Sequence, residues 1–235
     1  MPANKEAQEL IRTFVDSEST ETSSFQQSVQ KLVERTIVHG ALSVQSKALV
    51  LVALAASPTQ IDTDELRAVV RYARATGVSD QQIGKAVQLA SVAGFHSVST
   101  GIPILVDVLA SRGSWGEFKK TPADEEAILK FETQGPRPRP LDPMFEALLR
   151  TDREFFGILT EYLDAPWDDS LLDPKDCELI YIAIDVACTH LYEDGIRRHV
   201  KAALDLGVTA AEIAHVMQLA SLTGLRSVRA VAEVL

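Results

Sequence analysis

The sequence repeats itself, and two copies of one segment align without a gap at an offset of 130 residues. Residues 87–91 (VQLAS) fall on residues 217–221 (MQLAS), and Gly77 falls on Gly207. Matches spread over this length at one offset indicate a duplication. Because only two copies are present, we do not expect a solenoid. We expect two equivalent units whose apolar faces pack together as a pseudo-dimer.

Both copies carry the sequence pattern of helices. Apolar residues recur three and four positions apart, for example at Leu179, Ile182, Ala183 and Val186. Gly207 stands where a helix C-cap glycine belongs, and Thr209 with Glu212 three residues later forms a capping-box pattern. No alternating strand pattern is sustained. We therefore predict an all-α fold made of two homologous helical-bundle units packed as a pseudo-dimer.

The chain is expected to have four parts. Residues 1–24 would form an N-terminal helix followed by a polar loop, and residues 25–133 the first, degenerate helical unit. Residues 134–141 form a connector in which alternate prolines prevent a helix. Residues 142–235 form the second unit, which carries the candidate site.

Composition limits the partners that the chain can have. The formal net charge of -10 opposes binding to nucleic acid and to an anionic membrane surface. The N-terminus has no apolar signal-peptide core, and the longest apolar run, residues 48–56, is too short to span a bilayer. We expect a cytoplasmic protein with a small-molecule substrate and with no nucleic-acid or membrane partner.

One segment of the second copy is unlike ordinary core sequence. Residues 189–199 (THLYEDGIRRH) place five groups capable of proton transfer or anion binding between two apolar helices, namely His190, Tyr192, Glu193, Arg197 and His199. The first copy keeps only the arginine, as Arg67. At the positions of His190, Tyr192, Gly195 and His199 it has Gln60, Asp62, Glu65 and Val69. The scaffold was kept and the polar cluster was not, which places the function in the second copy.

The same segment and its flanks resemble a known family. Glu178 and the apolar residues after it, the polar segment, and residues 199–204 (HVKAAL) are similar to the carboxymuconolactone decarboxylase domain, which is shared with alkylhydroperoxidase D-like proteins. The resemblance covers most of residues 150–235 and, more weakly, residues 25–110. It implies a small helical domain, and the polar segment resembles that of a subgroup with tandem domains.

The resemblance does not extend to peroxidase chemistry. The peroxidase branch has a glutamate, then a CxxC pair, then a histidine, and Glu178 and His199 fit the first and last of these. Tyr192 and Gly195 occupy the two cysteine positions. Without a thiol pair, no thiolate can attack a peroxide and no second thiol can resolve the product. We therefore do not expect thiol peroxidase activity.

The decarboxylase branch implies acid–base chemistry without a cofactor. A carboxylated lactone loses carbon dioxide, which requires a cation for the carboxylate and a group that moves a proton near the enolate. We expect Arg197 to bind the carboxylate, His199 and His190 to transfer the proton, and Tyr192 or Glu178 to position it. The protein would be a lyase acting on a small carboxylated, lactone or aromatic-derived metabolite.

Two other interpretations remain open. His190, Glu193, His199 and Glu178 could ligate zinc or iron, although their spacing matches no established metal motif. The cluster could instead be structural, within a binding or assembly module of the same fold. His96, from the first copy, could reach the site. The resemblance further implies a homo-oligomer, a trimer or a dimer of two-unit chains.

Overall fold

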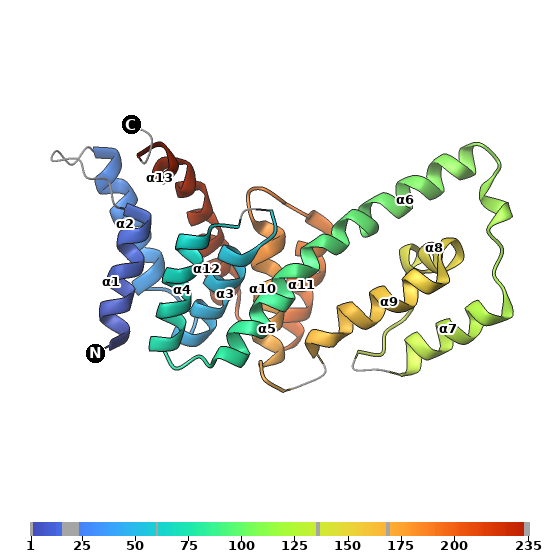
Figure 1. Ribbon diagram of the computed structural model, residues 1–235, viewed down its shortest axis with the longest axis horizontal. Helices are drawn as coiled ribbons and strands as arrows, with labels where there is room; N and C mark the ends of the chain where they lie inside the picture. The colour runs from blue at the N-terminus through green and yellow to red at the C-terminus, as the bar shows by residue number, and fades with distance from the viewer. Residues whose placement is uncertain (1, 16–23, 60, 135–136, 168–169, 233–235) are drawn as a thin grey trace. The chain divides into compact units, whose positions relative to one another are not determined.

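The computed structural model describes residues 2–15, 24–59, 61–134, 137–167 and 170–232, and all regular secondary structure in these ranges is helical (Figure 1). The chain divides into two compact units, one formed by Met1–Ala93 with Leu171–Leu235 and the other by Gly94–Ser170. The α-helices of the first compact unit are α1 (Pro2–Val15), α2 (Ser24–Val38), α3 (Val44–Ala56), α4 (Thr63–Ala75), α5 (Asp80–Ser91), α10 (Pro174–Val186), α11 (Glu193–Asp205), α12 (Ala210–Ser221) and α13 (Arg226–Ala232). Those of the second are α6 (His96–Ser111), α7 (Pro122–Thr133), α8 (Pro143–Thr151) and α9 (Arg153–Asp164).

The helix boundaries follow the sequence repeat. Helices α3, α4 and α5 begin and end 130 residues before α10, α11 and α12 respectively, and the 3₁₀ turns after α5 and α12 keep the same offset. The predicted all-α fold with an internal duplication is therefore confirmed.

Matching local signals set these boundaries. Ser79 with Gln82 and Thr209 with Glu212 form capping boxes at the starts of α5 and α12, each satisfying two backbone N–H groups. Gly77 and Gly207 follow α4 and α11 with φ angles of 89° and 85°. This left-handed conformation favours glycine, and it ends both helices at the same place.

The core of the first compact unit joins the two copies. Helices α3 and α10 are apolar on nearly every side, as expected of a helix surrounded by protein. Residues 47–55 of α3 and residues 177–185 of α10 are all buried. Helix α10 packs against α3 and α5 of the first copy as well as α11 and α12 of its own (Figure 1). The two copies thus share one core, which is the predicted pseudo-dimer.

The compact units divide the chain differently from the sequence repeat. Helices of both copies belong to the first compact unit because they share its core, whereas residues 94–170 pack separately. The predicted connector lies within the second compact unit, and its described residues 137–141 contain no helix. Residues 17–23 of the predicted polar loop lie outside the described residues. The predicted domain boundaries mark the sequence repeat and remain predictions.

The second compact unit is built around aromatic side chains. Phe131, Phe145 and Phe156 are buried and meet at ring-centroid distances of 5.4 to 6.2 Å. The guanidinium of Arg139 lies 4.5 Å from the Phe131 ring centroid and forms an ion pair of 2.8 Å with Asp164. Aromatic packing and this cation–π contact hold α7, α8 and α9 together.

One helical stretch, residues 80–111, is long and apolar enough to cross a membrane by length and composition alone. It is longer than the apolar run recognised in the sequence. Its first part, α5, buries Ile83, Ala86 and Leu89 against α3 and α10. Core helices of soluble proteins pass the same test, and the packing of α5 accounts for this part of the stretch.

We expect the chain to self-associate through α6. This helix has no buried residue, and Ile104, Leu105 and Val108 are 59%, 43% and 44% exposed. Clustered exposed apolar side chains commonly mark protein interfaces. Sedimentation velocity at micromolar concentration should show an oligomer, and the variant Ile104→Glu with Leu105→Glu should shift it towards single chains. A monomeric wild-type protein would contradict this expectation.

Candidate functional site

The candidate site is built on one face of α10. Glu178, Tyr181 and Asp185 are spaced three and four residues apart, so they lie on the same side of the helix. All three are buried. This face meets α11, the helix with which α10 packs most extensively. Two buried carboxyl groups therefore point towards the neighbouring helix.

The Glu178 and His199 side chains form a direct pair. The Nδ1 atom of His199 lies 2.7 Å from Oε2 of Glu178, and the two side chains are 15% and 5% exposed. The Tyr181 ring covers the imidazole at a centroid distance of 4.6 Å. A carboxylate that accepts the Nδ1–H fixes the imidazole tautomer and leaves Nε2 to exchange a proton. The predicted partnership of these two residues is present.

The segment between α10 and α11 places His190 beside Tyr192. The Tyr192 N–H donates to the Asp185 carbonyl at 2.9 Å, and the His190 N–H donates to the Ala187 carbonyl at 2.8 Å. Leu191 between them has a φ of 46°, a conformation that is strained for a side chain of this kind. The His190 and Tyr192 rings lie 6.0 Å apart. Burial lowers the pKa of His190, which favours the neutral ring.

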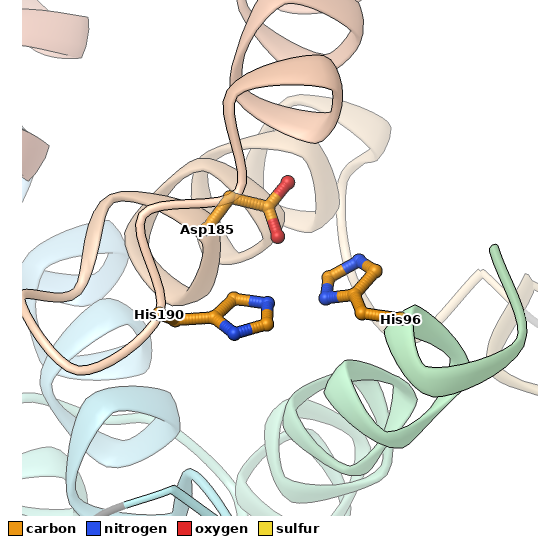
Figure 2. A group of neighbouring side chains, drawn as sticks. All are labelled: His96, Asp185 and His190. Atoms are coloured by element: carbon orange, nitrogen blue, oxygen red, sulfur yellow. The ribbon is translucent and has the colours of Figure 1, made fainter. Parts of the chain in front are cut away.

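Asp185 was not predicted as a site residue, yet it lies between the predicted ones. Its Oδ2 is 4.0 Å from Nε2 of His199, and one of its oxygens lies within 4.8 Å of a His190 ring nitrogen (Figure 2). The pKa of Asp185 is raised to about 7, mainly by burial; the positive charge of Arg198 opposes the rise and the nearby Glu178 adds to it. The repeat contains a signal for this residue, because Ala55 takes its place in the first copy.

Gly195 allows the close approach of Asp185. A Cβ atom at position 195 would lie 2.1 Å from Oδ2 of Asp185 and 2.5 Å from Cδ1 of Tyr192. The first copy has the reverse arrangement, with Ala55 on α3 and Glu65 on α4. Each copy thus has one carboxyl group at this contact. The second copy has it on α10, and the first copy has it on α4.

We expect Gly195→Ala to destabilise the protein by about 1–3 kcal/mol, the usual cost of overpacking. Part of that cost should disappear when Asp185→Ala is added, because one of the two clashing side chains is removed. The coupling free energy from urea unfolding of the four proteins in this cycle checks the contact. Strictly additive effects would show that Asp185 does not lie against Gly195.

Arg197 does not join the predicted cluster. Its side chain is 77% exposed and forms a 2.9 Å ion pair with Glu193, which is 82% exposed. Residues two apart on a helix point to different sides, so Arg197 and His199 face apart. The structure therefore does not bring Arg197, the expected carboxylate-binding residue, together with His199. Glu193 is likewise excluded from a metal set with Glu178 and His199.

We expect Arg197→Met to have little effect on the binding of small carboxylates, because the side chain is exposed and paired with Glu193 on another side of α11 from His199. Arg198 is the matched comparison, since it is adjacent in sequence and its charge acts on Asp185. Arg198→Met should raise the Kd for a small carboxylate several-fold. Equal effects of the two substitutions would count against this distinction.

The first copy lacks these groups and has an ion pair in their place. Ala48 and Val69 occupy the positions of Glu178 and His199, and both are fully buried. Glu65 instead receives two hydrogen bonds from Arg226 of α13, at 2.7 and 2.8 Å. This buried bidentate ion pair connects α4 to α13.

The described residues of the first compact unit do not make up a metal site by themselves. Asp185 and His190 supply two donor atoms within 4.8 Å, whereas zinc sites use three or four protein ligands. His96, also drawn in Figure 2, belongs to the second compact unit, and its participation stays a prediction. Two described cavities are lined by residues of the second compact unit.

Comparisons with known proteins agree with this architecture. Residues 153–235 match the Carboxymuconolactone decarboxylase family. The chain also resembles the crystal structure of a candidate gamma-carboxymuconolactone decarboxylase subunit from Burkholderia xenovorans LB400, with a TM-score of 0.79 and 25% sequence identity. That likeness covers 100% of this chain and 95% of the other. No curated protein matches. The second copy is thus similar to the carboxymuconolactone decarboxylase family, and the whole chain is similar to a solved structure described by that family's name.

Proposed function

We propose that the protein is a cofactor-independent acid–base enzyme of the lyase type that acts on a small carboxylated, lactone or aromatic-derived metabolite. The observation that carries this proposal is the buried 2.7 Å pair of Glu178 and His199. The first copy keeps the same helices with Ala48 and Val69 at these positions. The scaffold therefore folds without the pair, which supports a role in chemistry.

The pair has the properties that decarboxylation requires. When the bond to the departing carboxylate breaks, carbon dioxide leaves and the electron pair enters a neighbouring carbonyl group as an enolate. The enolate carbon must then take a proton. His199 can deliver that proton from Nε2, and the Glu178 carboxylate stabilises the protonated imidazole through Nδ1. A proton from water then restores His199.

The substrate anion needs a cation. Arg197 and Arg198 are both exposed, but Arg197 is paired with Glu193, which leaves Arg198 as the better candidate. Arg198 is adjacent to His199 in α11, and its positive charge acts on the buried Asp185. A cation beside the acid–base pair would attract the carboxylate of a substrate. Arg198 thus takes the role first expected of Arg197.

The test is turnover of a panel of small lactone carboxylates, followed by carbon dioxide release and by proton NMR in deuterated buffer. Decarboxylation should release carbon dioxide and place one solvent deuterium on the product carbon. His199→Gln should abolish both signals, and Arg67→Met, at the position of Arg197 in the first copy, is the control that should retain them. A panel without turnover, with unchanged ligand binding in His199→Gln, would favour the alternative of a non-catalytic binding or assembly module.

A further inference from the structure

A second carboxyl group faces the same imidazole from the other side. Glu178 occupies Nδ1 of His199 at 2.7 Å, and Asp185 lies 4.0 Å from Nε2. The second distance exceeds a hydrogen bond, for which about 2.7–3.2 Å is usual. A substrate oxygen or carbon that lies to one side of the line joining the two atoms can be within reach of both. Asp185 and His199 therefore share the side on which His199 exchanges its proton.

The contact with Gly195 fixes the position of Asp185. The absence of a Cβ atom at Gly195 lets the carboxyl group approach the first turn of α11, from which His199 projects one turn later. In the first copy, the corresponding carboxyl group is on the facing helix as Glu65 and is neutralised by Arg226. The second copy has Asp185 on α10, beside a histidine that the first copy lacks.

We propose that Asp185 is the second acid–base group of this site. It contacts the carbonyl oxygen of the substrate, and His199 protonates the adjacent carbon. This inference rests on the proposed function and deepens it, because it selects substrates in which a carbonyl group neighbours the carbon that loses its carboxylate. As that bond breaks, the electron pair moves to the carbonyl oxygen. The Asp185 O–H donates a hydrogen bond to this oxygen, and the His199 Nε2–H protonates the carbon.

The surroundings of Asp185 allow it to be protonated near neutral pH. Within the first compact unit, the charged and titratable groups that face it are Glu178 of α10, Arg198 and His199 of α11, and His190 of the segment between these helices. Burial has the largest effect and raises the pKa of Asp185 to about 7. A buried carboxylic acid that remains protonated can donate a hydrogen bond to an enolate oxygen.

The first experiment measures kcat against pH for Asp185→Asn on a substrate that the wild-type enzyme turns over. We expect kcat at low pH to fall by less than the about 100-fold that loss of an oxyanion donor costs, because the amide still donates a hydrogen bond but a weaker one. Wild-type activity should decline as pH rises through about 7, and this decline should vanish in Asp185→Asn, whose amide is a donor at every pH. The matched control is Asp176→Asn on the same helix, where burial also raises the pKa of the carboxyl group. It should keep both the rate and the decline.

The second experiment needs no substrate. In protein labelled with ¹³C at aspartate Cγ, one signal should titrate near pH 7, disappear in Asp185→Asn, remain in Asp176→Asn and shift its midpoint in His199→Gln. A signal of Asp185 that titrates below about pH 5 overturns the inference even if no substrate is found. Unchanged kcat and pH dependence in Asp185→Asn, alongside an inactive His199→Gln, would also overturn it while the proposed function stands.

Discussion

Replacing His199 with Val should abolish turnover and also destabilise the protein, whereas adding Glu178→Ala should restore stability without restoring activity. The single substitution leaves Glu178 buried without its imidazole partner. Breaking a buried charged pair in this way typically costs about 3–5 kcal/mol. The double variant reproduces Ala48 and Val69 of the first copy, where two apolar side chains pack at the same positions with no exposure. Its free energy of unfolding should therefore approach that of the wild-type protein.

The loss of turnover should be large in both variants. Removing a general acid or base commonly lowers kcat by about 10²- to 10⁴-fold, and here the proton donor itself is removed. Urea unfolding and steady-state kinetics on the same preparations separate the two effects. Glu178→Gln is the conservative comparison, because it keeps the volume but removes the negative charge that stabilises the imidazolium. If the stable double variant retained activity, Glu178 and His199 would have no part in the chemistry.

The helical architecture could be predicted because both copies carry the same local signals. Capping residues and C-cap glycines recur at the 130-residue offset, and the helices begin and end at that offset as well. The pairing of Glu178 with His199 could also be predicted, since the two lie on consecutive antiparallel helices with apolar faces towards each other. These inferences depend on periodicity and on local residue chemistry, and both can be identified from the sequence alone.

The remaining parts of the site depend on helix rotation and on contacts distant in sequence. Arg197 stands two residues before His199, and that spacing places its side chain on another side of α11, among solvent and Glu193. Asp185 stands within an apolar run, where it resembles an isolated polar residue of a core helix. Its proximity to His199 follows only once α11 is docked through Gly195. A comparison of the copies does single it out, because only one of them has a carboxyl group there.

The buried carboxyl group of Asp185 should make stability depend on pH. Its pKa in the folded protein is about 7, above the value of about 3.9 in an unfolded chain. Between these values, the folded state binds a proton that the unfolded state has lost. The contribution of Asp185 is therefore fully present below about pH 4 and is lost as pH rises to about 7. At 1.36 kcal/mol per pKa unit, the loss amounts to ~4 kcal/mol.

Asp185→Asn removes this dependence because its amide does not ionise, so the variant should gain ~4 kcal/mol relative to the wild-type protein between pH 4 and pH 8. Urea unfolding at unit intervals of pH measures the difference between the two curves. Other titrating groups affect both proteins equally and cancel in the difference. One is Asp124, where burial raises the pKa but hydrogen bonds from Arg153 and Thr121 outweigh it and lower the pKa. Asp107→Asn on the exposed surface of α6 is the control, because it removes a carboxyl group that is not buried. A stability curve for Asp185→Asn that runs parallel to that of the wild type would show that this carboxyl group ionises as readily in the folded chain as in water. The protonated acid required beside His199 would then be absent at neutral pH.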